Sequence, residues 1–316
     1  MPNLRSTRCI SATLALLALG LGGCPSSLGP LAKHANAFSA ATITVVNGAS
    51  DAYTKTNELH DQAEISLAVL DYDRKPAWNP NDYVRPLLSQ EQLAARIEIL
   101  NSLKSYAEKV ADLASGGKQT DLESAATQVG SSLQEMSKSV PSSLSTSIPD
   151  AGPMSDTTKN ALSTTLLGFG KFLQETKVTK SLPQVIEDND KNVSELCKFL
   201  DSDLRILRRQ ADVDYGRVIT SEDQYIRHEG STLSTEERRS EIHKLPQFAL
   251  EQRQNDQLLA KLQKTIQTLS ETHHAFAVAA HGSNPESLSQ YISDLSAQGQ
   301  SLAAFYQSLS NKPSAK

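Results

Sequence analysis

Glu271 and His274 have the residue types and the spacing that come nearest to a metal-binding motif in this chain. They form one Glu-x-x-His step, whereas helical bundles that bind two metal ions use two such steps and two further carboxylates. The sequence contains no second copy of the step, and His273 falls in an apolar helical stripe. We therefore expect a buried His273 beside a solvated His274, and we assign no cofactor. A metal-dependent helical enzyme that uses His273 and His274 is the least favoured hypothesis.

Other short patterns that carry chemistry are missing from the sequence. It has no His-Glu-x-x-His run, no Cys-x-x-Cys pair, no Gly-rich phosphate loop and no Gly-x-Ser-x-Gly elbow. With 31 basic and 36 acidic residues and no long basic run, the chain is mildly acidic, which argues against nucleic acid as a partner. These features favour a non-enzymatic protein that acts through its surface.

The first 24 residues have the composition of an export signal. Arg5 and Arg8 precede an apolar segment over residues 10–21, and the next acidic residue is Asp51. The apolar segment is too short to span a bilayer, which takes about 20 residues. A basic start, a short apolar middle and small residues at the end are typical of a cleaved signal.

The end of this signal, Leu21-Gly22-Gly23-Cys24, resembles the lipobox of bacterial lipoproteins. The resemblance covers residues 1–24 only. It implies cleavage before Cys24, transfer of diacylglycerol to the Cys24 thiol, and acylation of the new amino group. Each buried methylene contributes about 0.8 kcal/mol, and stable anchoring takes more than one chain. The alternative is an ordinary secretory signal with a cysteine at this position by chance.

The same resemblance implies a cellular location. The mature protein would be lipid-anchored in the bacterial cell envelope, facing the periplasm or the cell exterior. Pro25, and not Asp, follows the cysteine, which favours the outer membrane if the host is Gram-negative. Loss of two signal arginines leaves 29 basic against 36 acidic residues, a formal charge of −7. Cys197 then has no partner for an intramolecular disulfide, so the stability must come from packing.

The remaining sequence predicts an all-α protein. Aromatic residues are only 5% of the chain, and Leu and Ala recur at three- and four-residue steps. We expect an elongated antiparallel bundle of six or seven helices, several of them long and coiled-coil-like. The predicted division is a signal peptide over 1–23, a tether over 24–30 and a single helical domain over 31–316.

Helix boundaries follow from capping residues, prolines and glycines. Ser89 with Gln92, Thr120 with Glu123, and Ser234 with Glu237 have the spacing of a capping box. The predicted helices cover about 31–70, 89–114, 120–141, 156–176, 183–227, 234–281 and 285–309. A Pro-rich loop over 71–88 and a Ser/Pro-rich loop over 141–155 interrupt them.

The Pro-rich loop holds the only tryptophan, Trp78, with Tyr72 and Tyr83 nearby. Aromatic side chains on a proline-stiffened loop can contact a partner at a low cost in ordering. We predict that these three residues contact a protein or another component of the envelope. The alternative is that Trp78 closes one end of the bundle.

Two further segments give testable predictions. The apolar stretch over 164–173, TTLLGFGKFL, is either a buried short helix or a membrane-inserting element, although Lys171 interrupts it. On a later helix, Arg205 follows Asp201 by four residues and Arg208 precedes Asp212 by four, which predicts intrahelical ion pairs. His60 and Glu64, also four apart, are treated as a chance pair.

The leading hypothesis from the sequence is therefore a lipid-anchored helical-bundle protein of the envelope that acts as a scaffold, adaptor or binding module. A membrane-perturbing bundle that inserts residues 164–173 is the alternative. The partners expected are the membrane, through the lipid on Cys24, and a protein or other envelope component, but no nucleic acid.

Overall fold

The computed structural model describes residues 30–72, 75, 77–83, 86–116, 120–143, 155–175, 181–280 and 285–310. The lipobox, Cys24 and nearly all of the tether lie outside these residues. Seven α-helices and one short 3-10 helix make up the described regular structure, without a strand. The elements are α1 (Pro30–Tyr72), η1 (Pro80–Asp82), α2 (Gln90–Ala114), α3 (Thr120–Ser143), α4 (Asp156–Gln174), α5 (Leu182–Glu229), α6 (Thr235–Ala280) and α7 (Pro285–Ser310). The predicted all-α class is confirmed.

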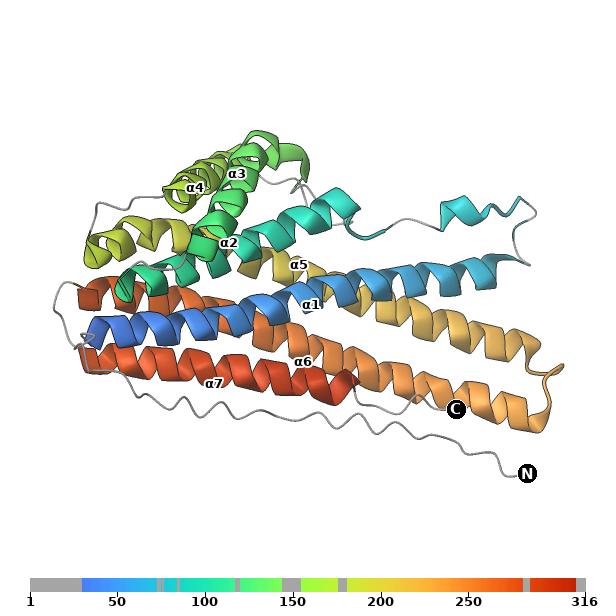
Figure 1. Ribbon diagram of the computed structural model, residues 1–316. Helices are drawn as coiled ribbons and strands as arrows, with labels where there is room; N and C mark the ends of the chain where they lie inside the picture. The colour runs from blue at the N-terminus through green and yellow to red at the C-terminus, as the bar shows by residue number, and fades with distance from the viewer. Residues whose placement is uncertain are drawn as a thin grey trace, which may run out of the picture.

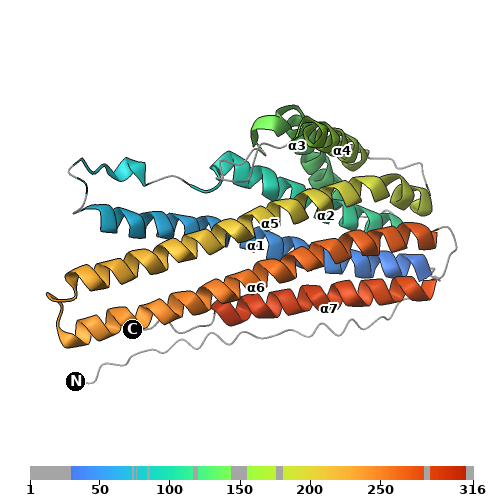
Figure 2. The same ribbon diagram turned by 180° about the vertical axis from the view of Figure 1, so that it is seen from behind.

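Helices α1, α5, α6 and α7 lie lengthwise along an elongated bundle (Figure 1). Helices α1, α5 and α7 run from one end, which we call the base, and α6 returns to it (Figures 1 and 2). The opposite end, where α1 finishes and α5 turns into α6, is called the tip. Helix α2 folds back along α1, and the α3–α4 pair packs beside α2 and α5.

The helices differ in length, and this difference shapes the tip. Helices α1, α5 and α6 have 43, 48 and 46 residues, whereas α7 has 26. At about 1.5 Å per residue the first three exceed 60 Å, and α7 is about 40 Å long. Helix α7 therefore ends partway along the bundle (Figures 1 and 2). The base has four long helices side by side, and the tip has three.

Capping interactions begin α2 and α6 where the sequence predicted them. The Ser89 hydroxyl accepts from the backbone N–H of Gln92, whose side chain accepts from the N–H of Ser89. The same reciprocal pair joins Ser234 and Glu237 before α6. These bonds satisfy backbone donors that the first turn leaves free.

Two prolines lie inside helices. Helix α3 continues to Ser143, so the prediction that Pro141 ends it and starts a loop was wrong by a few residues. Helix α6 continues through Pro246. Proline has a helical φ of about −65°, so each proline removes one backbone hydrogen bond without requiring a different φ. Helix α1 is likewise continuous across the β-branched residues and Gly48 near its middle.

One hydrophobic core includes side chains from all seven helices and consists largely of leucine, alanine and phenylalanine. At the crossing of α3 and α4 the backbones approach closely, at Gly130 and Gly170. A Cβ atom on Gly170 would lie 2.7 Å from the Gly130 carbonyl oxygen, and one on Gly130 would lie 2.6 Å from that of Gly170. Only glycine allows this crossing without a shift of the backbone.

Candidate functional site

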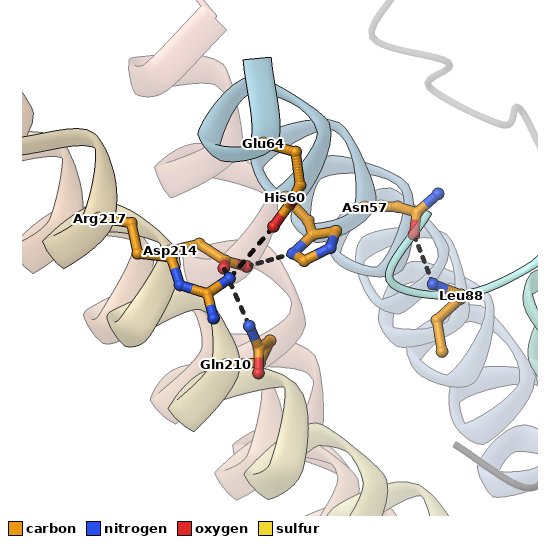
Figure 3. Close-up of polar contacts among 7 residues, drawn as sticks. All are labelled: Asn57, His60, Glu64, Leu88, Gln210, Asp214 and Arg217. Carbon is orange, nitrogen blue, oxygen red and sulfur yellow. Dashed lines mark hydrogen bonds and ion pairs between the residues drawn. The ribbon is translucent and has the colours of Figure 1, made fainter. Parts of the chain in front are cut away.

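A buried polar cluster joins α1 to α5 in the outer half of the bundle (Figure 3). His60 Nδ1 lies 2.9 Å from Asp214 Oδ2, and the Gln210 amide donates to the other carboxylate oxygen at 2.9 Å. Arg217 lies 3.6 Å from the same carboxylate and 3.2 Å from Glu64. Asp214 is fully buried, so its charge is balanced by these neighbours and not by water.

The protonation of His60 depends on this cluster. Burial on its own would lower the pKa of the imidazole, but the hydrogen bond and charge of Asp214, with the charge of Glu64, outweigh it. The pKa of His60 therefore lies above its usual value. The protonated form donates to Asp214 in a site where a charge-assisted hydrogen bond is strong.

Sequence analysis missed this cluster, because His60 and Asp214 are 154 residues apart. His60 and Glu64 both contribute to the cluster, through Asp214 and Arg217 respectively, although their spacing in the sequence did not indicate it. One signal was present in the sequence. Asp214 continues the buried stripe of α5 that contains Leu207, Ala211 and Val218, and an acid in an apolar stripe requires a partner.

The predicted aromatic residues come together at the tip end of α1. The ring of Tyr72 meets that of Trp78 edge-on at 5.1 Å, and Trp78 stacks on Tyr83 at 6.1 Å. Tyr83 is buried, Trp78 is half-buried and Tyr72 is 63% exposed. Of the three predicted contact residues, Tyr72 therefore offers most of its side chain to a partner, and Tyr83 offers little.

Hydrogen bonds hold this loop against α1. The Trp78 indole donates to the Ala68 carbonyl at 3.0 Å, and the Tyr83 hydroxyl donates to Asp71 at 2.9 Å. At the far side of the loop, the Leu88 backbone N–H donates to the Asn57 side chain at 2.8 Å (Figure 3). The aromatic residues are thus part of a fixed surface beside the end of α1.

Apolar side chains are unusually exposed in the outer half of the bundle. Among the described residues, ten large apolar side chains are exposed, and seven of them lie there. They are Ile65, Val69 and Tyr72 on α1, Val213 and Tyr225 on α5, and Ile242 and Leu250 on α6. Helix α6 contributes no buried side chain before Leu258. Clustered exposed apolar residues mark interaction sites more often than scattered ones do.

A pocket of about 260 Å³ lies among the three helices at the tip. It is lined by Ser66, Val69 and Leu70 of α1, by Ser221, Glu222 and Tyr225 of α5, and by Glu241 and Lys244 of α6. We call the surface between α1 and α6 that contains this pocket the tip groove. Three of the eight lining side chains are apolar or aromatic, two are serines and three are charged.

The charges in the tip groove do not cancel. The Lys244 ammonium lies 2.6 Å from Glu241, whereas no ion pair to Glu222 is found among the described residues. Burial raises the pKa of Glu222; the charge of Lys244 lowers it and that of Glu241 raises it, so the pKa lies above the usual value. A cation placed in the pocket would stabilise the charged form of Glu222.

The predicted histidine pair lies near the base. His273 is fully buried and His274 is exposed, as the sequence predicted, and both donate to Asp190, at 3.0 and 2.7 Å. The Tyr106 hydroxyl donates to His273 Nε2 at 2.7 Å. Burial lowers the pKa of His273 despite its bond to Asp190, so its neutral form suits these two bonds.

Glu271 is exposed and does not join this group. No group of three or more potential metal-ligating side chains is found among the described residues. The hydrogen-bond partners of His273 and His274 are instead those of a structural link between α6, α5 and α2. Asp190 and Tyr106, which complete this link, were not predicted.

The segment over 164–173 lies within α4. Four of its five large apolar side chains, Leu166, Phe169, Phe172 and Leu173, are buried in the core, and Leu167 is 38% exposed. Lys171 is exposed at the end of that helix. In this conformation the segment has a packing role, as the buried-helix interpretation expected.

Of the two ion pairs predicted within α5, that of Arg205 is confirmed and that of Arg208 is wrong. Arg205 donates to Asp201 at 2.6 Å, as predicted. The prediction that Arg208 pairs with Asp212 was wrong, because Arg208 forms a two-bond ion pair with Asp256 of α6. An interhelical carboxylate that faces both guanidinium nitrogens gives a better geometry than a neighbour one turn away.

Comparison with known proteins gives no relative for this chain. No family model matches it, and neither a curated protein nor a solved structure matches it. None of the described helices has a run of apolar residues long enough to cross a bilayer.

Proposed function

We propose that this protein is a lipid-anchored binding module of the bacterial envelope, which is held by Cys24 and contacts its partner with the tip. The observation that carries the proposal is the exposed apolar stripe of the tip. Ile65, Val69 and Tyr72 follow one another at four- and three-residue steps on α1, and each is at least 60% exposed. A non-enzymatic scaffold or adaptor requires such a surface and no catalytic group.

The position of the anchor relative to the tip supports this proposal. Helix α1 begins at Pro30, six residues after Cys24. Six residues span at most about 20 Å, whatever their conformation. The base would therefore stay close to the bilayer, and α1 would carry the tip about 60 Å along its axis from the first helical residue.

Lipidation is tested by changing Cys24→Ser. The expected result is loss of palmitate labelling and release of the protein from the membrane fraction. Cys197→Ser is the matched control, because Cys197 is buried in the core, and it should leave labelling and fractionation unchanged. Membrane attachment that survives Cys24→Ser would overturn the anchor.

Partner binding by the tip is tested by pull-down from detergent-solubilised envelopes. The variant Ile65→Ser should lose the bound material, because serine removes an exposed apolar contact on the tip. The control is Val278→Ser, since Val278 is 46% exposed near the base. Equal recovery with both variants would show that the tip is not the contact surface.

A further inference from the structure

Helix α7 occupies the space between α1 and α6 in the half of the bundle nearer the base. Gly299 of α7 packs on Thr44 of α1, where an added Cβ would lie 3.2 Å from the threonine methyl group. On the other side, Lys261 of α6 donates to Ser301 and lies over the ring of Phe305 at 5.2 Å. Helix α7 is therefore seated between both neighbours.

Beyond the end of α7, none of the described helices takes its place between α1 and α6. Ser310, the last residue of α7, follows Phe305 by five residues, and α7 runs opposite to α6. The end of α7 thus lies about level with residue 256 of α6. About 20 residues of α6, over 235–255, extend past it, which is a length of about 30 Å. The tip groove lies along this part of α6.

Among the described elements, only α1, α5 and α6 line the pocket of the tip groove. A fourth helix at the tip, which would repeat the four-helix arrangement of the base, is not supplied by the described helices.

Charge in the tip groove indicates what that helix carries. Val69, Leu70 and Tyr225 line the pocket together with Glu222, and no ion pair of the Glu222 carboxylate is found among the described residues. Lysine and arginine have an apolar stem with a charged end, so they match a pocket that has apolar side chains and a carboxylate. The tyrosine ring adds a favourable surface for a cation.

We propose that the tip groove binds an amphipathic helix of a partner protein, which continues the line of α7 and places a lysine or arginine beside Glu222. The leucine-type stripe of this helix packs on Ile65 and Val69 of α1 and on Leu250 of α6. This inference depends on the proposed function, because it names the partner of the same tip surface. In helix-in-groove binding of this kind, the bound helix contacts the groove through apolar side chains at positions i, i+3, i+4 and i+7.

Two synthetic helical peptides of about 20 residues test the proposal. Both carry leucines at three- and four-residue steps, and they differ at one central position, which is lysine in one and glutamate in the other. Binding to the full mature protein in detergent is measured by calorimetry and by the fluorescence of Trp78, the only tryptophan. The lysine peptide is expected to bind at least about tenfold more tightly than the glutamate peptide.

Variants of the protein test whether the tip groove causes the tighter binding of the lysine peptide. Glu222→Lys should reverse the preference, so that the glutamate peptide binds more tightly. Val69→Ser should weaken both peptides about tenfold or more, whereas Val278→Ser, a matched exposed valine near the base, should leave both affinities unchanged. Circular dichroism and thermal unfolding of each variant confirm that the bundle is folded.

Three outcomes would overturn the inference. Equal affinity for the two peptides would exclude recognition of a cation by Glu222, and the absence of peptide binding would exclude an added helix. A concentration-dependent dimer that Val69→Ser dissociates would assign the groove to a second copy of this chain. If Ile65→Ser no longer recovers the partner in the pull-down, but the lysine and glutamate peptides bind with equal affinity, this inference fails and the proposed function stands.

Discussion

His60 and Asp214 form a buried hydrogen bond of 2.9 Å between two helices that are 154 residues apart in the sequence. The bond joins α1 to α5 next to the tip groove (Figure 3). Its strength depends on the charge of the imidazole, because the carboxylate of Asp214 is fully buried and attracts a protonated histidine. The outer part of the bundle is therefore held by a pH-dependent contact.

This contact predicts a pH-dependent stability. The pKa of His60 is raised in the folded protein, so protonated His60 stabilises the fold. This contribution is complete below the unfolded pKa of about 6.5 and is lost as the pH rises through the higher folded pKa. Urea unfolding should show the wild type gaining stability over His60→Gln as the pH falls from 8.5 to 6. His243→Gln, at an exposed histidine, is the matched substitution. A difference between wild type and His60→Gln that does not change with pH would refute the prediction.

Arg96 and Asp203 form the most deeply buried ion pair that we describe. Two guanidinium nitrogens of Arg96 donate to the two oxygens of Asp203, at 2.7 and 2.8 Å, and Arg96 is fully buried. Asp203→Ala should cost about 3–5 kcal/mol, because it leaves a buried cation without its partner. Glu135→Ala, which breaks an exposed pair with Lys138, should cost less than about 1 kcal/mol. Urea denaturation compares the two, and equal costs would contradict the assignment.

Two Gly→Ala substitutions, one at the close crossing of α3 and α4 and one away from it on α5, should have opposite effects on stability. Gly216→Ala should stabilise the protein by about 0.5–1 kcal/mol, because alanine is the better helix former and nothing lies within 4 Å of its Cβ. Gly170→Ala should destabilise it by about 1–3 kcal/mol, since its Cβ meets the Gly130 carbonyl. Thermal unfolding measures both changes. Stabilisation by Gly170→Ala would mean that the helices separate easily.

Lys109 stabilises the end of α4. Its ammonium group donates to the carbonyl oxygens of Phe172, Leu173 and Glu175, at 2.7, 3.1 and 2.7 Å. Lys109→Met should destabilise the protein by about 1–3 kcal/mol, because the final carbonyls of the helix lose a charged donor. Hydrogen exchange should rise first at residues 170–175. Lys198→Met, at an exposed pair with Glu195, is the control and should leave exchange there unchanged.

Cys197 should react slowly with thiol reagents in the folded protein. The side chain is buried, and burial raises the pKa of its thiol to about 12, so the reactive thiolate is scarce. In a Cys9→Ser and Cys24→Ser variant, labelling by Ellman's reagent should follow unfolding as urea is raised. Rapid labelling without urea would show that α5 opens at this position.

The helices could be predicted from the sequence because their signals are local. Apolar spacing and capping pairs such as Ser234 with Glu237 depend on residues within one or two turns. The burial of His273 followed from the same spacing. The partners of polar side chains could not be predicted in this way. Asp256 for Arg208, and Asp190 for His273, become visible only when it is known which helices are neighbours.

The candidate site was predictable only in part. Clustering of Tyr72, Trp78 and Tyr83 followed from their closeness in the sequence, but the burial of Tyr83 required the position of the loop on α1. The short length of α7 was visible in the sequence. That α7 lies between α1 and α6, and leaves a groove there, depends on the packing of helices from opposite ends of the chain.

Helix α6 has no buried side chain between Thr235 and Gln257, which has a consequence for how the protein opens. Few apolar contacts hold this segment, so it should separate from α5 at a much lower free energy than the core over 258–277. Opening of this kind exposes the outer half of α5 while the base remains folded. A ligand that packs on this segment of α6 would slow the amide exchange of the segment far more than that of the base. The outer half of the bundle would then unfold at the same temperature as the base.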